Sequence, residues 1–168
     1  VVDGFAESNV ENDTLKICVI ERHRASGNIG KGFVKGFKLK SGAIASTVAH
    51  DSHNMVIIGT NDEDMYKAAV ALIKSHGGKI VVNNGEVISH LPLPVAGLIS
   101  DKDSDYVIEK GEELARATKS LGCELEDAFM PMGFLPLPVI PELKITDKGV
   151  FDTTKCQFVD IFDVMANV

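Results

Sequence analysis

The chain has 168 residues, of which 45% are hydrophobic and 24% are charged, as expected for one globular domain with a buried core. Its net charge of −7, with no block of Lys and Arg, disfavours nucleic acid and anionic membranes as partners, and no apolar run is long enough to span a membrane. The three cysteines are scattered, lack metal-binding spacing and are odd in number, which favours a reducing, cytoplasmic location.

The chain opens with a polar, acidic stretch that has little periodicity. We therefore predict a lead-in or linker over residues 1–13 and a single domain over residues 14–168. Residues 14–20 alternate as a strand does, and a glycine-rich segment follows over residues 25–38, with Asn28 among its first glycines. These glycines do not open an amphipathic helix, so we interpret them as bulges and close backbone approaches in twisted strands rather than as a phosphate-binding loop.

The most informative stretch runs over residues 42–54. Its first half, residues 43–49, is small and apolar and predicts a strand that is buried on both faces. Five polar residues follow at once, and residues 55–59 then resume an apolar strand. The five are His50, Asp51, Ser52, His53 and Asn54. Polar groups between two buried strands are costly unless something satisfies them, so the pattern indicates a functional site.

The polar loop supplies a general acid or base, hydrogen-bond donors and candidate metal ligands. The His50-x-x-His53 spacing is weak support for a metal because it lacks helical placement and has no nearby cysteine. The alternative is a plain polar hairpin loop in which Asp51 and Asn54 bond to the local backbone. The buried strands on either side favour the functional interpretation.

Two helices are predicted farther along the chain. The first begins in the capping sequence at residues 60–64 and ends at Gly77-Gly78, and the second spans about residues 103–121 with Gly122 as its stop. Between them, residues 79–89 predict a hairpin, and the prolines after His90 predict an edge strand or irregular segment. The pentapeptide at residues 91–95 returns at residues 135–139, which hints at two related halves.

The region after the second helix, residues 129–147, is apolar and rich in proline. An exposed surface of this kind suggests contact with another domain or with a second subunit in a homo-oligomer. For the fold, strands dominate the first half and helices follow β units. We therefore predict an α/β or α+β layered sandwich with a mixed sheet and two main helices, and not a TIM barrel.

Several motifs occur together in a recognisable order. Beyond the loop stretch at residues 42–54, they are Gly-Asn-Ile-Gly at 27–30, Gly-Phe-Val-Lys-Gly-Phe at 32–37, Gly-Thr-Asn-Asp-Glu-Asp-Met at 59–65, Leu-Pro-Leu-Pro-Val-Ala-Gly-Leu at 91–98 and Leu-Pro-Val-Ile-Pro-Glu-Leu at 137–143. With these motifs the chain closely resembles the C-terminal domain of the prokaryotic-type adenine deaminases of the amidohydrolase superfamily, over about residues 15–160.

The resemblance implies hydrolysis of adenine to hypoxanthine and ammonia, a purine-salvage reaction that uses a divalent metal, manganese, iron or zinc, in the full-length enzyme. In the family most metal ligands lie on a preceding barrel domain that begins with a His-x-His pair, and no such pair occurs here. We therefore expect no metal ligand in this chain and no activity of the chain alone. The expected partners are the preceding barrel domain and, for the whole enzyme, adenine.

The site residues that we expect follow from this resemblance and from the polar loop. His50, Asp51 and His53 are the catalytic candidates, presented toward the substrate mouth. Ser52, Asn54 and Asn28 are the substrate-binding candidates.

Two other functions stay open. The chain could be a stand-alone domain that binds purines or another small ligand in regulation. It could also be a self-sufficient metallohydrolase that uses the loop histidines, Asp51 and either His23 or His90.

Overall fold

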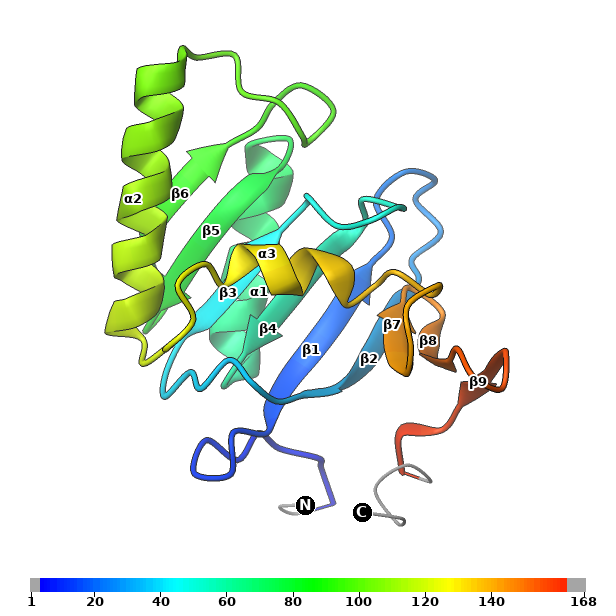
Figure 1. The fold of residues 1–168 in the computed structure, drawn as a ribbon. Helices are drawn as coiled ribbons and strands as arrows, with labels where there is room; N and C mark the ends of the chain where they lie inside the picture. The colour runs from blue at the N-terminus through cyan, green and yellow to red at the C-terminus, as the bar shows by residue number, and fades with distance from the viewer. Residues whose placement is uncertain (1–3, 163–168) are drawn as a thin grey trace.

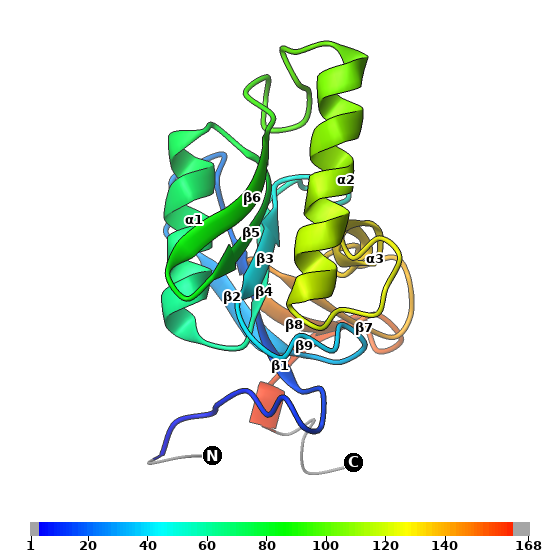
Figure 2. The ribbon, with the colours of Figure 1, turned by 90° about the vertical axis from the view of Figure 1, so that its left-hand side faces the viewer.

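The computed structural model describes residues 4–162 as an antiparallel sheet with helices on both faces and a small second sheet at one edge (Figures 1 and 2). The large sheet has the strand order β2-β1-β4-β3-β5-β6, and the small one the order β7-β8-β9. The elements along the chain are β1 (Leu15–Ile20), β2 (Ile29–Val34), β3 (Ala43–Ser46), β4 (Met55–Gly59), α1 (Asp62–Lys74), β5 (Gly78–Asn83), β6 (Glu86–Pro92), α2 (Ser104–Ser120), α3 (Phe129–Phe134), β7 (Leu143–Thr146), β8 (Gly149–Asp152) and β9 (Gln157–Val159).

The predicted α+β class with two main helices and no barrel is confirmed, but the prediction of a mixed sheet is wrong. Every pair of neighbouring strands is antiparallel. Strands β4 and β5, which α1 connects, do run in the same direction, as a β-α-β unit predicts. Strand β3 lies between them and pairs antiparallel with both, so no parallel pair forms.

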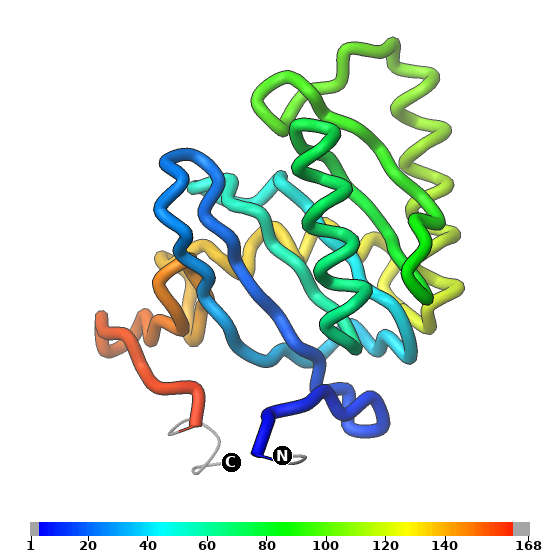
Figure 3. The backbone as a smooth tube through the Cα atoms, turned by 180° about the vertical axis from the view of Figure 1, so that it is seen from behind, coloured from blue at the N-terminus to red at the C-terminus, as the bar shows by residue number. Residues whose placement is uncertain are grey.

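Two apolar layers cover the two faces of the large sheet. On one face α1 packs over β3, β4 and β5 (Figure 3). Leu72 of α1 is fully buried in this layer. On the other face α2 and α3 pack over a larger core that includes Ile44, Ile58 and Met132. Strands β3 and β4 are buried on both faces, which explains why their sequences are continuous apolar runs rather than alternating ones.

The small sheet packs against β2 and depends on the glycines of that strand. A Cβ atom at Gly30 would overlap the carbonyl oxygen of Thr146, and one at Gly32 would crowd the side chains of Ile145 and Val150 at 3.2 and 3.3 Å. The prediction of close backbone approach is confirmed for Gly30, whereas Gly32 makes room for side chains. The predicted bulges do not occur within β2, whose pairing with β1 is regular.

Most predicted elements occur close to their predicted positions. The first helix begins after Asn61, whose side chain accepts a hydrogen bond from the backbone N–H of Asp64, and the second begins after Asp103. Strand β6 is an edge strand, as the prolines indicate. Helix α3 and strands β7 and β8 were not predicted, since Pro131 and Gly133 are poor helix formers. Pro131 is tolerated because it lies in the first turn.

The repeated pentapeptide does not mark two related halves. Its first copy ends β6 and enters a loop, whereas its second lies in the turns after α3. The predicted lead-in is outside the described residues at positions 1–3. The described part of this segment contacts the sheet, because Glu7 forms an ion pair with Lys16 at 2.7 Å, and Ser8 Oγ donates to the carbonyl of Gly59 and accepts from the N–H of Lys16. Within residues 4–162 no helix is long and apolar enough to cross a membrane.

Candidate functional site

Three loops meet at one end of the large sheet, beyond the ends of its strands. They follow β1, β3 and β6 and span residues 21–28, 47–54 and 93–100. The antiparallel pairing explains this arrangement, because β1, β3 and β6 run in the same direction and so finish at the same end of the sheet (Figure 1). The five predicted site residues 50–54 therefore lie within a cluster of loops rather than in an isolated hairpin.

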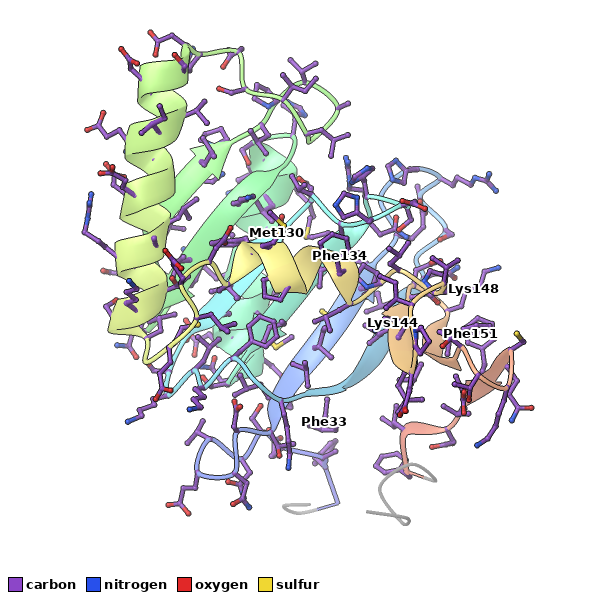
Figure 4. The ribbon with its side chains drawn as sticks, viewed as in Figure 1. Phe33, Met130, Phe134, Lys144, Lys148 and Phe151 are labelled. Atoms are coloured by element: carbon purple, nitrogen blue, oxygen red, sulfur yellow. The ribbon has the colours of Figure 1, made fainter. Side chains whose placement is uncertain are left out.

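The two loop histidines lie close together. Their ring centroids are 5.7 Å apart, and the ring of His50 also stacks on Phe134 at 4.8 Å. Figure 4 shows Phe134 at the C-terminal end of α3, on the side toward the loop. The backbone N–H of His50 donates to the carbonyl of Gly133 at 2.8 Å, so α3 holds the loop through both a ring contact and a hydrogen bond.

His53 has a left-handed backbone, with φ of +51°, and its ring turns back onto its own loop. The backbone N–H of Ala49 donates to His53 Nδ1 at 3.2 Å, and the N–H of His53 donates to the carbonyl of Ala49 at 2.7 Å. Burial lowers the pKa of His53 below its usual value, and the neighbouring His50 and Arg22 act in the same direction. His53 is therefore an uncharged ring at neutral pH.

Two predicted substrate-binding residues, Asn54 and Asn28, meet on a third residue, Asp147. Asn54 Nδ2 donates to Asp147 Oδ1 at 3.3 Å, and Asn28 Nδ2 donates to Asp147 Oδ2 at 3.2 Å. Asn54 is buried, and its Oδ1 has no hydrogen-bond partner among the described residues. The alternative of a plain hairpin loop with local Asn54 bonds does not fit, because this side chain bonds to the turn between β7 and β8.

The other predicted residues lie at the rim of the loop cluster. Asp51 and Ser52 are exposed, and the exposed His23 contacts the carbonyl of Ser52 through Nε2 at 2.7 Å. His90 lies on β6, which β5 separates from β3, so it is not part of the loop cluster. The structure thus brings His50, His53 and His23 near one another and leaves His90 apart.

Three residues that hold this site were not predicted from the sequence. Arg22 bonds to the loop backbone, Asp147 accepts from two asparagines, and Phe134 stacks on His50. A signal existed for Arg22, because a charged residue directly after a buried strand must find a partner or reach water. No local signal marked Asp147 or Phe134, which are distant in sequence.

A metal centre does not fit the donors present. Within residues 4–162 no group of three or more His, Cys, Asp and Glu side chains is arranged to hold a metal ion. His50 and His53 are close, but the ring of His53 is turned so that Nδ1 accepts from the backbone. The self-sufficient metallohydrolase therefore lacks a ligand set in the described part of the chain.

Two hollows of the described surface lie away from the loop cluster. A groove of about 580 Å³ is lined by apolar residues of β1, β2 and α1, and a smaller hollow of about 250 Å³ lies between β2 and the small sheet. None of their lining residues comes from residues 50–54.

The structure defines the class of protein as an α+β sandwich domain with polar loops gathered at one end of its large sheet. Comparison with known proteins adds the family, because the family model described as the adenine deaminase C-terminal domain matches residues 1–157. The chain therefore belongs to the adenine deaminase C-terminal domain family.

Similar proteins support the same assignment. An adenine deaminase of Methanothrix thermoacetophila is 50% identical over 162 residues, which cover 96% of this chain and 28% of that protein. Adenine deaminases of Moorella thermoacetica and Brucella abortus are 48% and 50% identical, over 96% and 91% of this chain and 27% and 26% of their own lengths. The chain thus spans about a quarter of the length of these relatives.

Proposed function

We propose that this chain acts as the C-terminal domain of an adenine deaminase and completes or covers an active site carried by a preceding barrel domain. The observation that carries the proposal is the 50% identity to a protein named adenine deaminase, over nearly the whole chain. The whole protein would hydrolyse adenine to hypoxanthine and ammonia in purine salvage. The divalent metal would lie in the preceding domain, since the donors described here do not fit one.

The loop cluster would face the substrate mouth. Its polar groups differ in kind: His53 is a neutral ring, and Asn54 carries a buried carbonyl without a partner among the described residues. A purine presents ring nitrogens and an exocyclic amine, and a site of hydrogen-bonding side chains can discriminate such a ligand. His50, Asp51 and His53 would donate or accept protons. Ser52, Asn54 and Asn28 would form hydrogen bonds that orient the purine base.

Exposed apolar side chains beside the loop would contact the barrel domain. Met130, which lies on α3 with Phe134 (Figure 4), is 60% exposed, and Val139, five residues after the end of α3, is 76% exposed. Helix α3 is the element that contacts His50. Exposed apolar groups next to polar site residues are typical of an interface between domains. The preceding domain would then cover the loop cluster in the longer protein.

The first test is adenine turnover with ammonia release, measured with manganese, iron or zinc. It compares this chain alone with the chain joined to its preceding domain. We expect activity in the longer protein only. Metal-dependent turnover by the chain alone would overturn the division of labour, and adenine binding without turnover in either protein would favour a regulatory purine-binding domain instead.

A second test addresses the loop in the longer protein. Both His53 and the exposed His76 have a left-handed backbone, with φ of +51° and +61°, so the same replacement by Asn is tolerated by the backbone at each. We expect His53→Asn to lower kcat/KM at least about tenfold with metal content preserved, as for loss of one positioned proton-transfer or hydrogen-bonding group. His76→Asn should leave it unchanged. Equal kinetics for the two variants would refute the placement of the loop.

A further inference from the structure

Arg22 lies in the loop after β1 and joins two other loops of the cluster. Its Nε donates to the carbonyl of His53 at 2.5 Å, and its Nη2 donates to the carbonyl of Ala96 at 2.7 Å. We propose that Arg22 is a positioning residue that fixes the backbone and ring of His53, so that Nδ1 accepts from the protein and Nε2 carries the proton offered to a ligand.

The two acceptor residues of Arg22 share an uncommon backbone. His53 and Ala96 are both in the left-handed region, with φ of +51° and +57°, which residues other than glycine adopt rarely. Such conformations persist only where the surroundings hold them. A guanidinium group suits this role because its rigid fork donates to two carbonyls at once, which the single ammonium group of lysine does less well.

The orientation of the His53 ring determines which nitrogen carries the proton. Because the backbone N–H of Ala49 donates to Nδ1, Nδ1 must be unprotonated in the neutral ring. The proton then lies on Nε2, for which no hydrogen bond is found within residues 4–162. If the carbonyl of His53 were released, the left-handed turn would relax and the bond from Ala49 would be lost.

The charged and titratable groups around His53 come from two loops. His50 and Asp51 share its own loop, and Arg22 and His23 face it from the loop after β1. Burial, His50, Arg22 and His23 all lower the pKa of His53, and Asp51 opposes them. The positive charge of Arg22 thus favours the neutral ring of His53.

Gly97 lies directly against the guanidinium group of Arg22. A Cβ atom on Gly97 would lie 2.8 Å from both terminal nitrogens of the guanidinium, so this residue leaves just enough room for the arginine. The loop of Gly97 is itself tied to the sheet. Thr47 Oγ1 donates to the carbonyl of Gly97 at 2.6 Å and accepts from the N–H of Gly78 at 2.8 Å.

The test is NMR of the chain labelled with ¹⁵N and ¹³C at histidine, followed across pH. In the unaltered chain we expect the Nε2-protonated form of His53 to dominate and its pKa to lie below the usual 6.5. In Arg22→Ala the pKa should move up toward 6.5 and the two neutral forms should become mixed. Arg24→Ala, which removes an exposed arginine of the same loop, should change neither.

Two further variants keep the proposal falsifiable in case Arg22→Ala does not fold. Arg22→Lys retains the charge but loses the fork, so the proton should redistribute between the ring nitrogens. Gly97→Ala should displace the guanidinium and have a similar effect. A His53 signal that is unchanged in every folded variant, even with a lower melting temperature, would reduce Arg22 to a structural role and overturn the proposal.

The proposal depends on the proposed function only for the use to which the Nε2 proton is put. The NMR readout is made on this chain and needs no substrate. If Arg22 controls His53 as expected but His53→Asn leaves adenine turnover intact, the proposed placement of the loop fails and the role of Arg22 stands. If instead His53→Asn lowers adenine turnover but the Arg22 variants leave the His53 signal unchanged, the proposed function stands and Arg22 has no positioning role in it.

Discussion

Glu21 organises the loop after β1 by accepting several backbone hydrogen bonds. Its carboxylate accepts from the N–H groups of His23, Arg24 and Ser26 and from the hydroxyl of Ser26, with the Arg24 and Ser26 backbone bonds at 2.8 and 3.0 Å. These bonds, led by the one from Ser26, lower the pKa of Glu21 from 4.5 to about 2. The loop that carries Arg22 is thus held by its preceding residue.

We expect the contribution of Glu21 to stability to depend on pH. Because its pKa is lowered in the folded state, the stabilisation is present above about pH 4.5 and is lost as the pH falls toward about 2. Glu21→Gln should therefore lower the melting temperature at pH 7 and have little effect near pH 2.5. Thermal unfolding followed by circular dichroism at both pH values checks this, and an equal difference at the two values would contradict it.

At the scale of elements, the small sheet depends on how closely it approaches β2. The strand has glycine at two alternate positions, Gly30 and Gly32, and both face the hairpin of β7 and β8. This contact brings Asp147, in the turn of that hairpin, to Asn28 and Asn54. Packing between the two sheets therefore also assembles part of the candidate site.

A pair of glycine substitutions tests this packing. Gly30→Ala should destabilise the fold by about 2 kcal/mol or more, because its Cβ would overlap a backbone carbonyl that cannot move independently. Gly111→Ala in α2 is the matched control, since a Cβ there meets nothing within 4 Å, and it should stabilise by roughly 0.5–1 kcal/mol. Urea unfolding gives both values. Equal effects of the two changes would contradict the close approach.

At the scale of the whole molecule, the sheet topology gathers distant segments at one end of the large sheet. Three loops and the turn at Asp147 meet there, so the polar groups of residues 50–54 contact residues up to 93 positions away. Helix α3, which contacts the polar loop through Gly133 and Phe134, carries the exposed apolar side chain of Met130. An exposed apolar group on an element that contacts polar loops supports the proposed contact with a second domain.

The chain alone should not depend on a metal. We expect the purified chain, dialysed against a chelator and then against buffer, to hold far less than one equivalent of manganese, iron or zinc and to keep its melting temperature. Elemental analysis and thermal unfolding check this. About one equivalent of metal, with a lower melting temperature after chelation, would restore the self-sufficient metallohydrolase.

The sequence predicted the local features well because their causes are local. Capping residues, alternation and glycine stops placed α1, α2 and most strands, and the polar run between two apolar runs correctly placed residues 50–54 in a loop between two buried strands. Helix α3 escaped prediction because packing, and not propensity, stabilises a segment that contains Pro131 and Gly133.

By itself, the sequence determined α1, α2, most strands of the large sheet and the family resemblance, since these depend on residue type and spacing. Only the tertiary structure decided that β3 lies between β4 and β5, which makes the sheet antiparallel throughout. It alone also decided that Arg22 reaches Ala96 and that Asn28 reaches Asp147, across 74 and 119 positions. The physical reason is that such contacts depend on strand order and loop packing, which no local pattern of residues encodes.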